Sequence, residues 1–395
     1  MSDRDEIVVL SATRTPQGRI SGQLASLTAV QLGAVAVRAA LERSGLGPEA
    51  VDAVVMGQVL QAGAGQNPAR QTAIAAGIGW DVPTVTVNKV CLSGLAAIIE
   101  ASRMIRLGDA DVVVAGGQES MTNAPYLLPG ARNGWKFGSV AALDHTDHDG
   151  LTDAFDQESM GSSTERHNKG LQLTREAQDE VAARSHQRAA AAWESGAFDD
   201  EIAEVSVPQR KGDPIVIRTD EGIRPDTTVE TLARLRPAFS PDGTITAGNS
   251  SQLTDGAAAV VLTTRANAEA KGLTWLATLG AYGQVAGPDN SLHAQPSQAI
   301  KAALARAGWT ADELDVIEIN EAFAAVAVQS MLELGVSSDK VNLHGGAISL
   351  GHPIGASGAR LVVHAAHELA RRGGGRAAVA LCGGGGQGDA LLLHR

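Results

Sequence analysis

The chain repeats one pattern of apolar and polar residues in its two halves. Residues 36–57 (AVRAALERSGLGPEAVDAVVMG) and residues 299–320 (AIKAALARAGWTADELDVIEIN) align without a gap. Each copy places apolar residues at helical spacing, ends at a glycine, and continues through a short loop into an apolar run typical of a strand. Chance similarity between two alanine-rich helices is the alternative, but the order and spacing of the glycines also agree.

A second pair of segments supports the duplication. In residues 87–118 a Val-Asn pair, a Ser-Gly pair, a helix ending at glycine and an apolar strand follow one another, and residues 341–387 repeat this order. The second copy has ten extra residues between Val-Asn and Ser-Gly, and this loop holds His344 and His352. We therefore predict that each half reads βαβαβαββ, with a mainly parallel sheet covered by helices on both faces. The halves should pack about a pseudo-two-fold axis.

The stretch of residues 119–250 is irregular and rich in Gly, Asp, Ser and Pro. Its one clear helical pattern runs from Thr174, a suitable N-cap, to about Ala197. A structureless stretch of this length is improbable, so we interpret it as a small inserted domain that covers a cleft. The predicted division is an N-terminal half of residues 1–118 plus 251–267, an insertion of residues 119–250, and a C-terminal half of residues 268–395.

Composition and charge narrow the function classes. Apolar residues make up 44% of the 395 residues and charged residues 19%, as in a globular protein. The net charge of −12 argues against nucleic acid as a partner. No apolar run approaches the ~20 residues that span a membrane, and the first residues resemble neither a signal nor a transit peptide. We expect a cytoplasmic enzyme that does not bind membranes, with its two cysteines as free thiols.

Cys91 occupies the junction between a strand that ends near Val90 and a helix that begins at or just after Cys91. A thiol at a helix N-terminus faces unpaired N–H groups and the positive end of the helix dipole, which favour the thiolate. We therefore predict that the pKa of Cys91 lies below the ~8.5 of a free thiol. On position alone, Cys91 is either a nucleophile or a small buried core residue.

His352 lies in the glycine-rich segment of residues 345–358. By the repeat, this loop enters the strand–helix junction of the second half that corresponds to the junction of Cys91. Pseudo-symmetry would bring the two junctions together, and a histidine in contact with a cysteine is the arrangement that activates a thiol. A solvated loop histidine is the alternative.

Cys382 follows an apolar strand and precedes four glycines, Gly383–Gly386. The bare N–H groups of such a run suit a developing oxyanion, and the run is not a standard phosphate loop because no Lys-Ser/Thr follows. A flexible turn is the alternative. Asn320, at another strand-to-helix turn, can orient a water, donate to an oxyanion or simply cap a helix.

These segments together resemble the thiolase family. The three signatures of that family correspond here to Asn88-Lys-Val-Cys-Leu-Ser-Gly94, Asn320-Glu-Ala-Phe-Ala324 and Gly351-His-Pro-Ile-Gly-Ala-Ser-Gly358. The resemblance spans essentially the whole chain and includes Gly116-Gly-Gln-Glu-Ser-Met121 and Thr246-Ala-Gly-Asn-Ser-Ser251. It is strongest to bacterial biosynthetic-type acetyl-CoA acetyltransferases. The implied fold is α/β, with duplicated βαβαβαββ halves in five α-β-α-β-α layers and an inserted loop domain.

The resemblance also implies a reaction, the reversible Claisen condensation of two acetyl-CoA to acetoacetyl-CoA and CoA. In it Cys91 becomes acylated with help from His352, and Cys382 removes a proton from the methyl group of a second acetyl-CoA. One oxyanion site would use His352 and a water held by Asn320. The other would use the backbone N–H groups of Cys91 and Gly384.

The implied substrates are CoA thioesters, with no separate cofactor and no metal. Four residues are expected to contact the nucleotide and pantetheine of CoA: Arg224, Thr231, Ala247 and Ser251. Four more are expected to line the tunnel: Leu151, Met160, Ala322 and Phe323. The resemblance further implies a homotetramer built as a dimer of dimers, in which the insertion helps to join the dimers.

The chain departs from the biosynthetic pattern at three places. It has Ser159-Met160 where many members have His-Met, Leu292-His-Ala-Gln-Pro296 where many have Met-Gly-Thr-Gly-Pro, and Gly383 where many have isoleucine. The rival within the family is therefore a degradative 3-ketoacyl-CoA thiolase of broader chain-length specificity. A decarboxylating ketoacyl synthase typically has His at the position of Cys382, and a non-catalytic relative would be expected to lose Cys91, Cys382 or His352.

Overall fold

The computed structural model describes residues 6–395, so residues 1–5 of the predicted N-terminal half lie outside the described residues. The first half follows the predicted order. Its elements are β1 (Ile7–Arg14), α1 (Ala29–Ser44), β3 (Ala53–Gly57), α2 (Pro68–Ala75), β4 (Thr84–Val87), α3 (Ser93–Leu107), β5 (Val112–Ser120) and β10 (Thr254–Thr264). A short strand, β2 (Gly18–Arg19), pairs with the start of β10.

The second half repeats this order with one shortened element. It comprises β11 (Ala277–Ala286), α8 (Gln295–Ala307), β12 (Val316–Ile319), α9 (Ala324–Leu334), α10 (Ala347–Leu350), α11 (Ser357–Arg372), β13 (Arg376–Gly383) and β14 (Gln387–His394). The counterpart of β4 is a single parallel bridge between Ile317 and Val341. The side chain of Asn342 then bonds both the N–H and the C=O of Ile319 (2.8 and 2.9 Å), which satisfies backbone groups that a longer strand would have paired.

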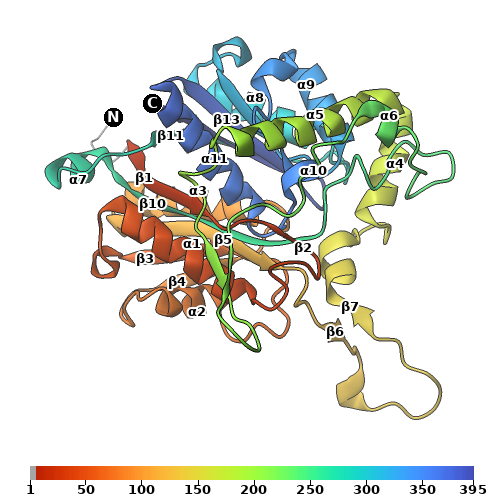
Figure 1. The fold of residues 1–395 in the computed structure, drawn as a ribbon, viewed down its shortest axis with the longest axis horizontal. Helices are drawn as coiled ribbons and strands as arrows, with labels where there is room; N and C mark the ends of the chain where they lie inside the picture. The colour runs from red at the N-terminus through yellow and green to blue at the C-terminus, as the bar shows by residue number, and fades with distance from the viewer. Residues whose placement is uncertain (1–5) are drawn as a thin grey trace.

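The two halves pack as five layers (Figure 1). α3 and α11 lie side by side in the centre, and one apolar core joins them to strands of both halves. α1 and α2 cover the outer face of the first half's strands, and α8 covers the outer face of the second half's strands. The predicted layering is therefore confirmed, and the central helices are the elements that bring the two strand–helix junctions together.

The prediction of a mainly parallel sheet is wrong. The main sheet has the order β12-β13-β14-β11-β1-β10-β5-β3-β4, and only the pairs β3–β4, β3–β5 and β12–β13 are parallel. A crossover helix is what makes neighbouring strands parallel, and β14 follows β13 through a short turn without one, while β10 runs antiparallel to both β5 and β1. β1 and β11 also pair antiparallel, from Ile7 with Leu279 to Val9 with Ala277, which joins the halves into one hydrogen-bonded sheet.

The segment between β5 and β10 has more structure than its sequence pattern indicates. It contains β6 (Tyr126–Leu127), β7 (Leu143–Asp144), a π-helical turn (Thr146–Leu151), α4 (Met160–Leu171), α5 (Arg175–Glu194), β8 (Val205–Val207), β9 (Ile215–Ile217) and α6 (Val229–Leu232). α5 begins after Thr174, whose side chain accepts a hydrogen bond from the N–H of Ala177, as predicted. α4 was not predicted because it buries polar side chains, among them Glu165 and Asn168, in place of an apolar stripe.

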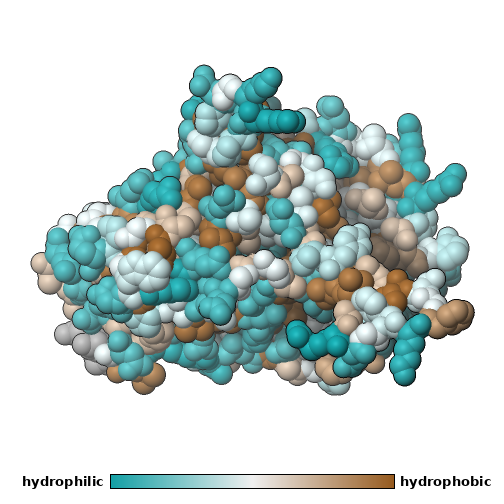
Figure 2. Space-filling view, turned by 90° about the horizontal axis from the view of Figure 1, so that it is seen from below, coloured by the Kyte–Doolittle hydropathy of each residue, from teal (hydrophilic) through white to brown (hydrophobic). Residues whose placement is uncertain are grey.

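An arm containing β6 and β7 projects from the body of the molecule (Figure 1). It carries exposed apolar side chains, which are Tyr126, Leu128, Trp135, Phe137 and Val140. Figure 2 looks at the molecule from the side on which the arm projects and shows a mostly hydrophilic surface with scattered hydrophobic patches. Outside these elements, α7 (Arg265–Ala270) follows β10. Among the helices of residues 6–395, none combines the length and apolar character needed to span a bilayer.

Candidate active site

Cys91 lies in a tight turn between β4 and α3. Val90, directly before it, has φ 50°, a left-handed conformation that is costly for a β-branched residue. Ser93 holds the turn, because its hydroxyl accepts a hydrogen bond from the N–H of Lys89 (2.8 Å) and donates one to the C=O of Val90 (2.6 Å). The turn directs the thiol of Cys91 into a pocket rather than along the helix.

The prediction of a lowered pKa for Cys91 is wrong. Burial raises the pKa of the thiol to about 11, and hydrogen bonds from the N–H groups of Gly384 and Cys91 only partly oppose this. The physical reason is the cluster of apolar side chains around Cys91, which includes Val59 and Leu60. The cost of removing a thiolate from water in this cluster exceeds the stabilisation that the backbone N–H groups give it. Cys91 is therefore a neutral thiol that needs a base when it attacks.

His352 supplies a candidate base. It lies between α10 and α11, and its Nδ1 is 2.6 Å from the hydroxyl of Ser357, which itself donates to the C=O of Pro353 (3.0 Å). Because that hydroxyl has one proton to give, Nδ1 carries the imidazole proton and Nε2 is left as an acceptor. Burial, assisted by the nearby charge of Arg360, lowers the pKa of His352 to about 3, so the ring is neutral near pH 7.

Asn320 lies behind this imidazole. Its amide nitrogen is 3.4 Å from Nδ1 and 3.5 Å from Nε2 of His352, and the residue is fully buried. The other amide atom, Oδ1, is buried without a hydrogen-bond partner among residues 6–395. An unpaired buried amide oxygen is a candidate holder of a small polar ligand such as water.

Cys382 lies near the end of β13 and is almost fully buried, in an apolar cluster with Leu292, Ala322 and Val326. Burial raises the pKa of this thiol far above its ordinary value, and the neighbouring Cys91 raises it further. Gly384, two residues later, lines the same pocket as Cys91, and its backbone N–H lowers the pKa of the Cys91 thiol. The turn after β13 is thus built into the same site as the turn after β4.

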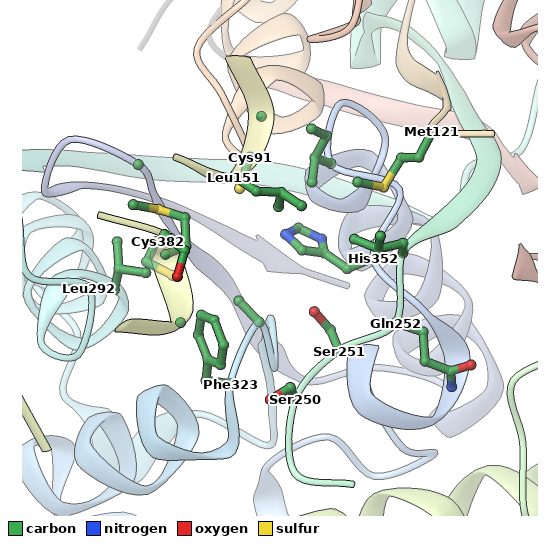
Figure 3. A pocket seen from close by; sticks show the side chains of 18 of the residues that line it. Cys91, Met121, Leu151, Ser250, Ser251, Gln252, Leu292, Phe323, His352 and Cys382 are labelled. Carbon is green, nitrogen blue, oxygen red and sulfur yellow. The ribbon is translucent and has the colours of Figure 1, made fainter. Parts of the chain in front are cut away.

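The three reactive side chains meet in one cavity. Cys91, His352 and Cys382 all line a pocket of ≈ 220 Å³. Figure 3 shows their side chains pointing into it, with Leu292 and Phe323 bordering the Cys382 side. The site therefore combines two thiols and one neutral imidazole in a mostly apolar enclosure.

Two family models match the chain: "Thiolase, N-terminal domain" over residues 7–266 and "Thiolase, C-terminal domain" over residues 273–395. The chain belongs to the thiolase family. A protein of Mycolicibacterium smegmatis named probable acetyl-CoA acetyltransferase is 58% identical over 98% of this chain and 100% of its own length. The acetyl-CoA acetyltransferase of Cupriavidus necator is 49% identical over 99% of each chain.

A solved structure confirms the predicted thiolase fold. The crystal structure of the Bacillus anthracis acetyl-CoA acetyltransferase matches this thiolase with a TM-score of 0.96 at 40% identity, over 98% of each chain. Agreement over the whole length includes both halves and the segment between them. The site described above therefore lies within a fold that this thiolase shares with that enzyme.

Most of the residues that the sequence predicts for the site do line the pocket of this thiolase. They are Cys91, His352, Cys382, Gly384, Ser251, Leu151, Met160, Ala322 and Phe323. Arg224, Thr231 and Ala247 are exposed on the insertion and lie outside the pocket. The hydroxyl of Thr231 is used in the cap of α6, where it bonds the N–H and C=O of Thr228.

Several pocket residues of this thiolase were missed by sequence reasoning. They include Met121, Asp147, Gly150, Gly161, Phe239, Ser250, Gln252, Leu253 and Ile354. Most lie on loops, which have no periodic pattern to mark a buried face. Met121 and Ile354 belong to motifs quoted above, so proximity to those motifs was an available signal. Within residues 6–395, no group of three or more metal-ligating side chains is placed to hold a metal ion.

Proposed function

We propose that this thiolase is an acetyl-CoA C-acetyltransferase, which joins two acetyl-CoA reversibly to give acetoacetyl-CoA and CoA. The observation that carries the proposal is the meeting of Cys91, His352 and Cys382 in one cavity. Relatives named acetyl-CoA acetyltransferase, 49–58% identical over nearly the whole chain, support acetyl as the group that is transferred. Two separate thiols suit a reaction that needs both a nucleophile and a base.

In the first half-reaction, Cys91 takes the acetyl group. As its sulfur attacks the thioester carbonyl, the thiol proton passes to Nε2 of His352, whose imidazole is neutral before this step. The bond between the carbonyl carbon and the sulfur of CoA breaks. The departing sulfur needs a proton, and Cys382 can supply it from the same cavity and become a thiolate.

In the second half-reaction, that thiolate acts as the base. It removes a proton from the methyl group of a second acetyl-CoA, and the high pKa of the Cys382 thiol makes its thiolate a strong base. The carbanion attacks the acyl group on Cys91 and the carbon–carbon bond forms. Cys91 leaves as a thiolate and recovers its proton from His352, which returns the site to its starting state.

Two groups of donors are suited to the negative charge that develops on oxygen. The backbone N–H groups of Gly384 and Cys91 both favour negative charge at the Cys91 sulfur, so they are suited to the tetrahedral intermediate of acyl transfer. His352, with a water held by the unpaired amide oxygen of Asn320, is proposed to stabilise the enolate oxygen of the second substrate.

The CoA portion of the substrate is proposed to run from the pocket along the insertion. Leu151, Met160, Ala322, Phe323 and Ser251 would contact its acyl and pantetheine end. Arg224, Thr231 and Ala247 would contact the remoter nucleotide end, where the exposed guanidinium of Arg224 suits a phosphate. The alternative function, that of a degradative thiolase for longer 3-ketoacyl chains, is supported by no observation among the described residues.

CoA-dependent thiolysis of acetoacetyl-CoA, compared with 3-ketohexanoyl-, 3-ketooctanoyl- and 3-ketopalmitoyl-CoA, tests the proposal. Activity confined to acetoacetyl-CoA is expected. Equal or faster thiolysis of the longer chains would instead establish the degradative reading, and no activity on any of them would contradict both. Cys91→Ala should abolish acyl-enzyme formation. Cys382→Ala should still become acylated but should not exchange the α-protons of acetyl-CoA with solvent.

We also propose a homotetramer in which the insertion helps to join two dimers. The exposed apolar and aromatic side chains of the β6–β7 arm support a protein contact there, because exposed apolar clusters commonly mark interfaces. The mass of the purified enzyme by light scattering tests this. A cytoplasmic location stays a prediction from the sequence.

A further inference from the structure

Glu119 is a buried carboxylate to which the proposed reaction gives no role. It belongs to the Gly116–Met121 segment and lies near the end of β5, fully buried. Its Oε2 accepts hydrogen bonds from the N–H groups of Val59 (3.0 Å) and Gly355 (2.9 Å), and its Oε1 accepts one from the N–H of Leu60 (3.1 Å). All three donors are backbone groups, so the carboxylate organises two loops.

One of these loops packs beside Cys91, and the other carries His352 and Ile354, which line the catalytic cavity. Val59 and Leu60 follow β3 and pack in the apolar cluster that contacts Cys91. Gly355 lies three residues after His352, in the loop between α10 and α11 of the second half. The side chain of Glu119 therefore binds both the loop that packs beside Cys91 and the loop that carries His352.

The His352 loop lies tightly against the first half at this point. A Cβ added at Gly355 would lie 2.6 Å from Oε2 of Glu119 and 2.8 Å from the Cα of Gln58, and a Cβ at Gly117 would lie 2.1 Å from the C=O of Gly355. The loop is also anchored to the first half through the N–H of His352, which lies 3.0 Å from the hydroxyl of Thr254 and 3.3 Å from the C=O of Gln252. A contact this close fixes the height of the loop above β5.

We propose that Glu119 is a positioning residue for acyl transfer: through Gly355 it holds the His352 loop where the imidazole can take the proton of Cys91. The inference rests on the proposed function, in which His352 is the base for Cys91. Glu119 itself touches neither the substrate nor the reacting sulfur. Its contribution is the alignment of the base, which is a large part of general-base catalysis.

The charge of Glu119 acts on the site in the opposite direction. Burial raises the pKa of Glu119 to about 7, against the three backbone N–H groups, and Asp255 of β10 raises it further. The carboxylate, when ionised, raises the pKa of the Cys91 thiol. Removing the charge alone would therefore ease ionisation of Cys91, whereas losing the alignment would slow its reaction. The sign of the effect distinguishes the two roles.

Glu119→Gln tests the inference, because the amide keeps the size of the side chain but replaces one accepting oxygen with an NH₂ group that cannot accept an N–H. Acetylation of Cys91 by acetyl-CoA is measured in a single turnover. We expect the rate at pH 8 to fall at least tenfold at saturating acetyl-CoA, with the half-saturating concentration changed less than threefold. The wild-type rate should fall as the pH drops through about 7, where Glu119 becomes protonated, and the rate of E119Q should not.

Two further variants separate an effect on the position of His352 from a general loss of stability. Glu119→Asp retains the charge but shortens the reach, so it should also acylate slowly. Gln118→Leu is the control: Gln118 is the adjacent buried residue of β5, and its side chain bonds Gln58 and Thr72 instead of the His352 loop. Q118L should lower the melting temperature without changing the acylation rate more than twofold.

Acylation of E119Q or E119D at the wild-type rate or faster would overturn the inference, and so would an equal loss of rate in Q118L. Failure of the wild-type enzyme to be acylated would instead overturn the proposed function. In that case alkylation of Cys91 by iodoacetamide still tests Glu119. Slower alkylation of E119Q than of wild type would support the positioning role, and equal or faster alkylation would overturn it.

Discussion

At the scale of single residues, the reactivity of the site depends on which hydrogen bonds orient its groups. Both thiols are neutral at physiological pH because the enclosure is apolar, so activation has to come from an aligned imidazole and not from a preformed thiolate. The direct contact that orients the ring of the imidazole is the 2.6 Å hydrogen bond between His352 and Ser357. It fixes the tautomer as well as the ring orientation.

Ser357→Ala should therefore slow the enzyme without weakening substrate binding. Loss of one orienting hydrogen bond, about 1–1.5 kcal/mol, corresponds to a roughly tenfold lower kcat. Steady-state thiolysis of acetoacetyl-CoA measures this, and KM should stay within threefold. Ser102→Ala is the matched control, since Ser102 is a buried helical serine of α3 that bonds only a backbone carbonyl, that of Ile99. Equal kcat values for the two variants would contradict the prediction.

At the scale of elements, an ion pair fastens the turn of Cys91 to the strand that follows the glycine run. Lys89, before the turn, places Nζ 2.7 and 2.9 Å from the two carboxylate oxygens of Asp389 in β14. Asp389 is fully buried and pairs across the hairpin with Leu381, next to Cys382. The pair thus ties the two elements whose ends supply Cys91 and Gly384.

Lys89→Met should destabilise the protein strongly, because it leaves the Asp389 carboxylate buried without its partner. Breaking a buried pair in this way costs about 3–5 kcal/mol, whereas replacing both charges with apolar residues is often close to neutral. The double variant K89M/D389L should therefore recover most of the lost stability. Chemical denaturation measures both variants.

Lys169→Met provides the control for that experiment. Lys169 and Asp242 form a pair 3.0 Å apart that is mostly exposed to solvent, so its loss should change the stability very little. If K89M and K169M unfolded at the same denaturant concentration, the buried Lys89–Asp389 pair would contribute no more to stability than an exposed pair, which would contradict the prediction.

At the scale of the whole molecule, a buried charge cluster attaches the insertion to both halves. Arg14 of β1 bonds Glu201 (2.6 Å) and Asp220 (2.8 and 3.0 Å) of the insertion, and Glu201 also bonds His364 of α11 (2.8 Å). The guanidinium of Arg14 lies 5.0 Å from the ring of Phe198. Because the insertion carries part of the pocket wall, this attachment also supports the site.

Glu201→Gln should lower the stability by several kcal/mol, since Arg14 keeps only Asp220 as a counter-charge and His364 loses its buried carboxylate partner. Burial alone would raise the pKa of Glu201, but His364 and Arg14 outweigh it and hold that pKa well below its usual range. This contribution is present above the unfolded pKa of about 4.3 and is lost as the pH falls through the folded pKa. Burial would lower the pKa of His364, but Glu201 raises it, so that contribution is present below about pH 6.5 and is lost as the pH rises through the raised value.

The difference in stability between wild type and E201Q should therefore be largest near pH 5–6 and should shrink at higher pH. Denaturation at a series of pH values measures it. Glu204→Gln is the control, because Glu204 pairs with Arg218 on the surface and should contribute little at any pH. A pH-independent difference would contradict the assignment of the effect to Glu201 and His364.

The sequence alone determined what depends on local spacing and residue chemistry. The duplicated helix–strand units, the N-cap of α5 at Thr174 and the junctions that hold Cys91 and His352 follow from patterns within about 20 residues. The motifs around those junctions were specific enough to indicate the thiolase family. They also named nine residues that line the pocket, although the roles proposed for those residues stay predictions.

The tertiary structure alone decided what depends on partners distant in the sequence. Strand direction was set by which strands meet in the sheet, and α4 is stable because its buried Glu165 and Asn168 find hydrogen-bond partners distant in the sequence, such as Thr244. The direction of the pKa shift of Cys91 was set by the apolar side chains around it, because desolvation by the whole enclosure outweighs the local N–H groups. A sequence pattern records neighbours along the chain, whereas burial and charge pairing depend on neighbours in space.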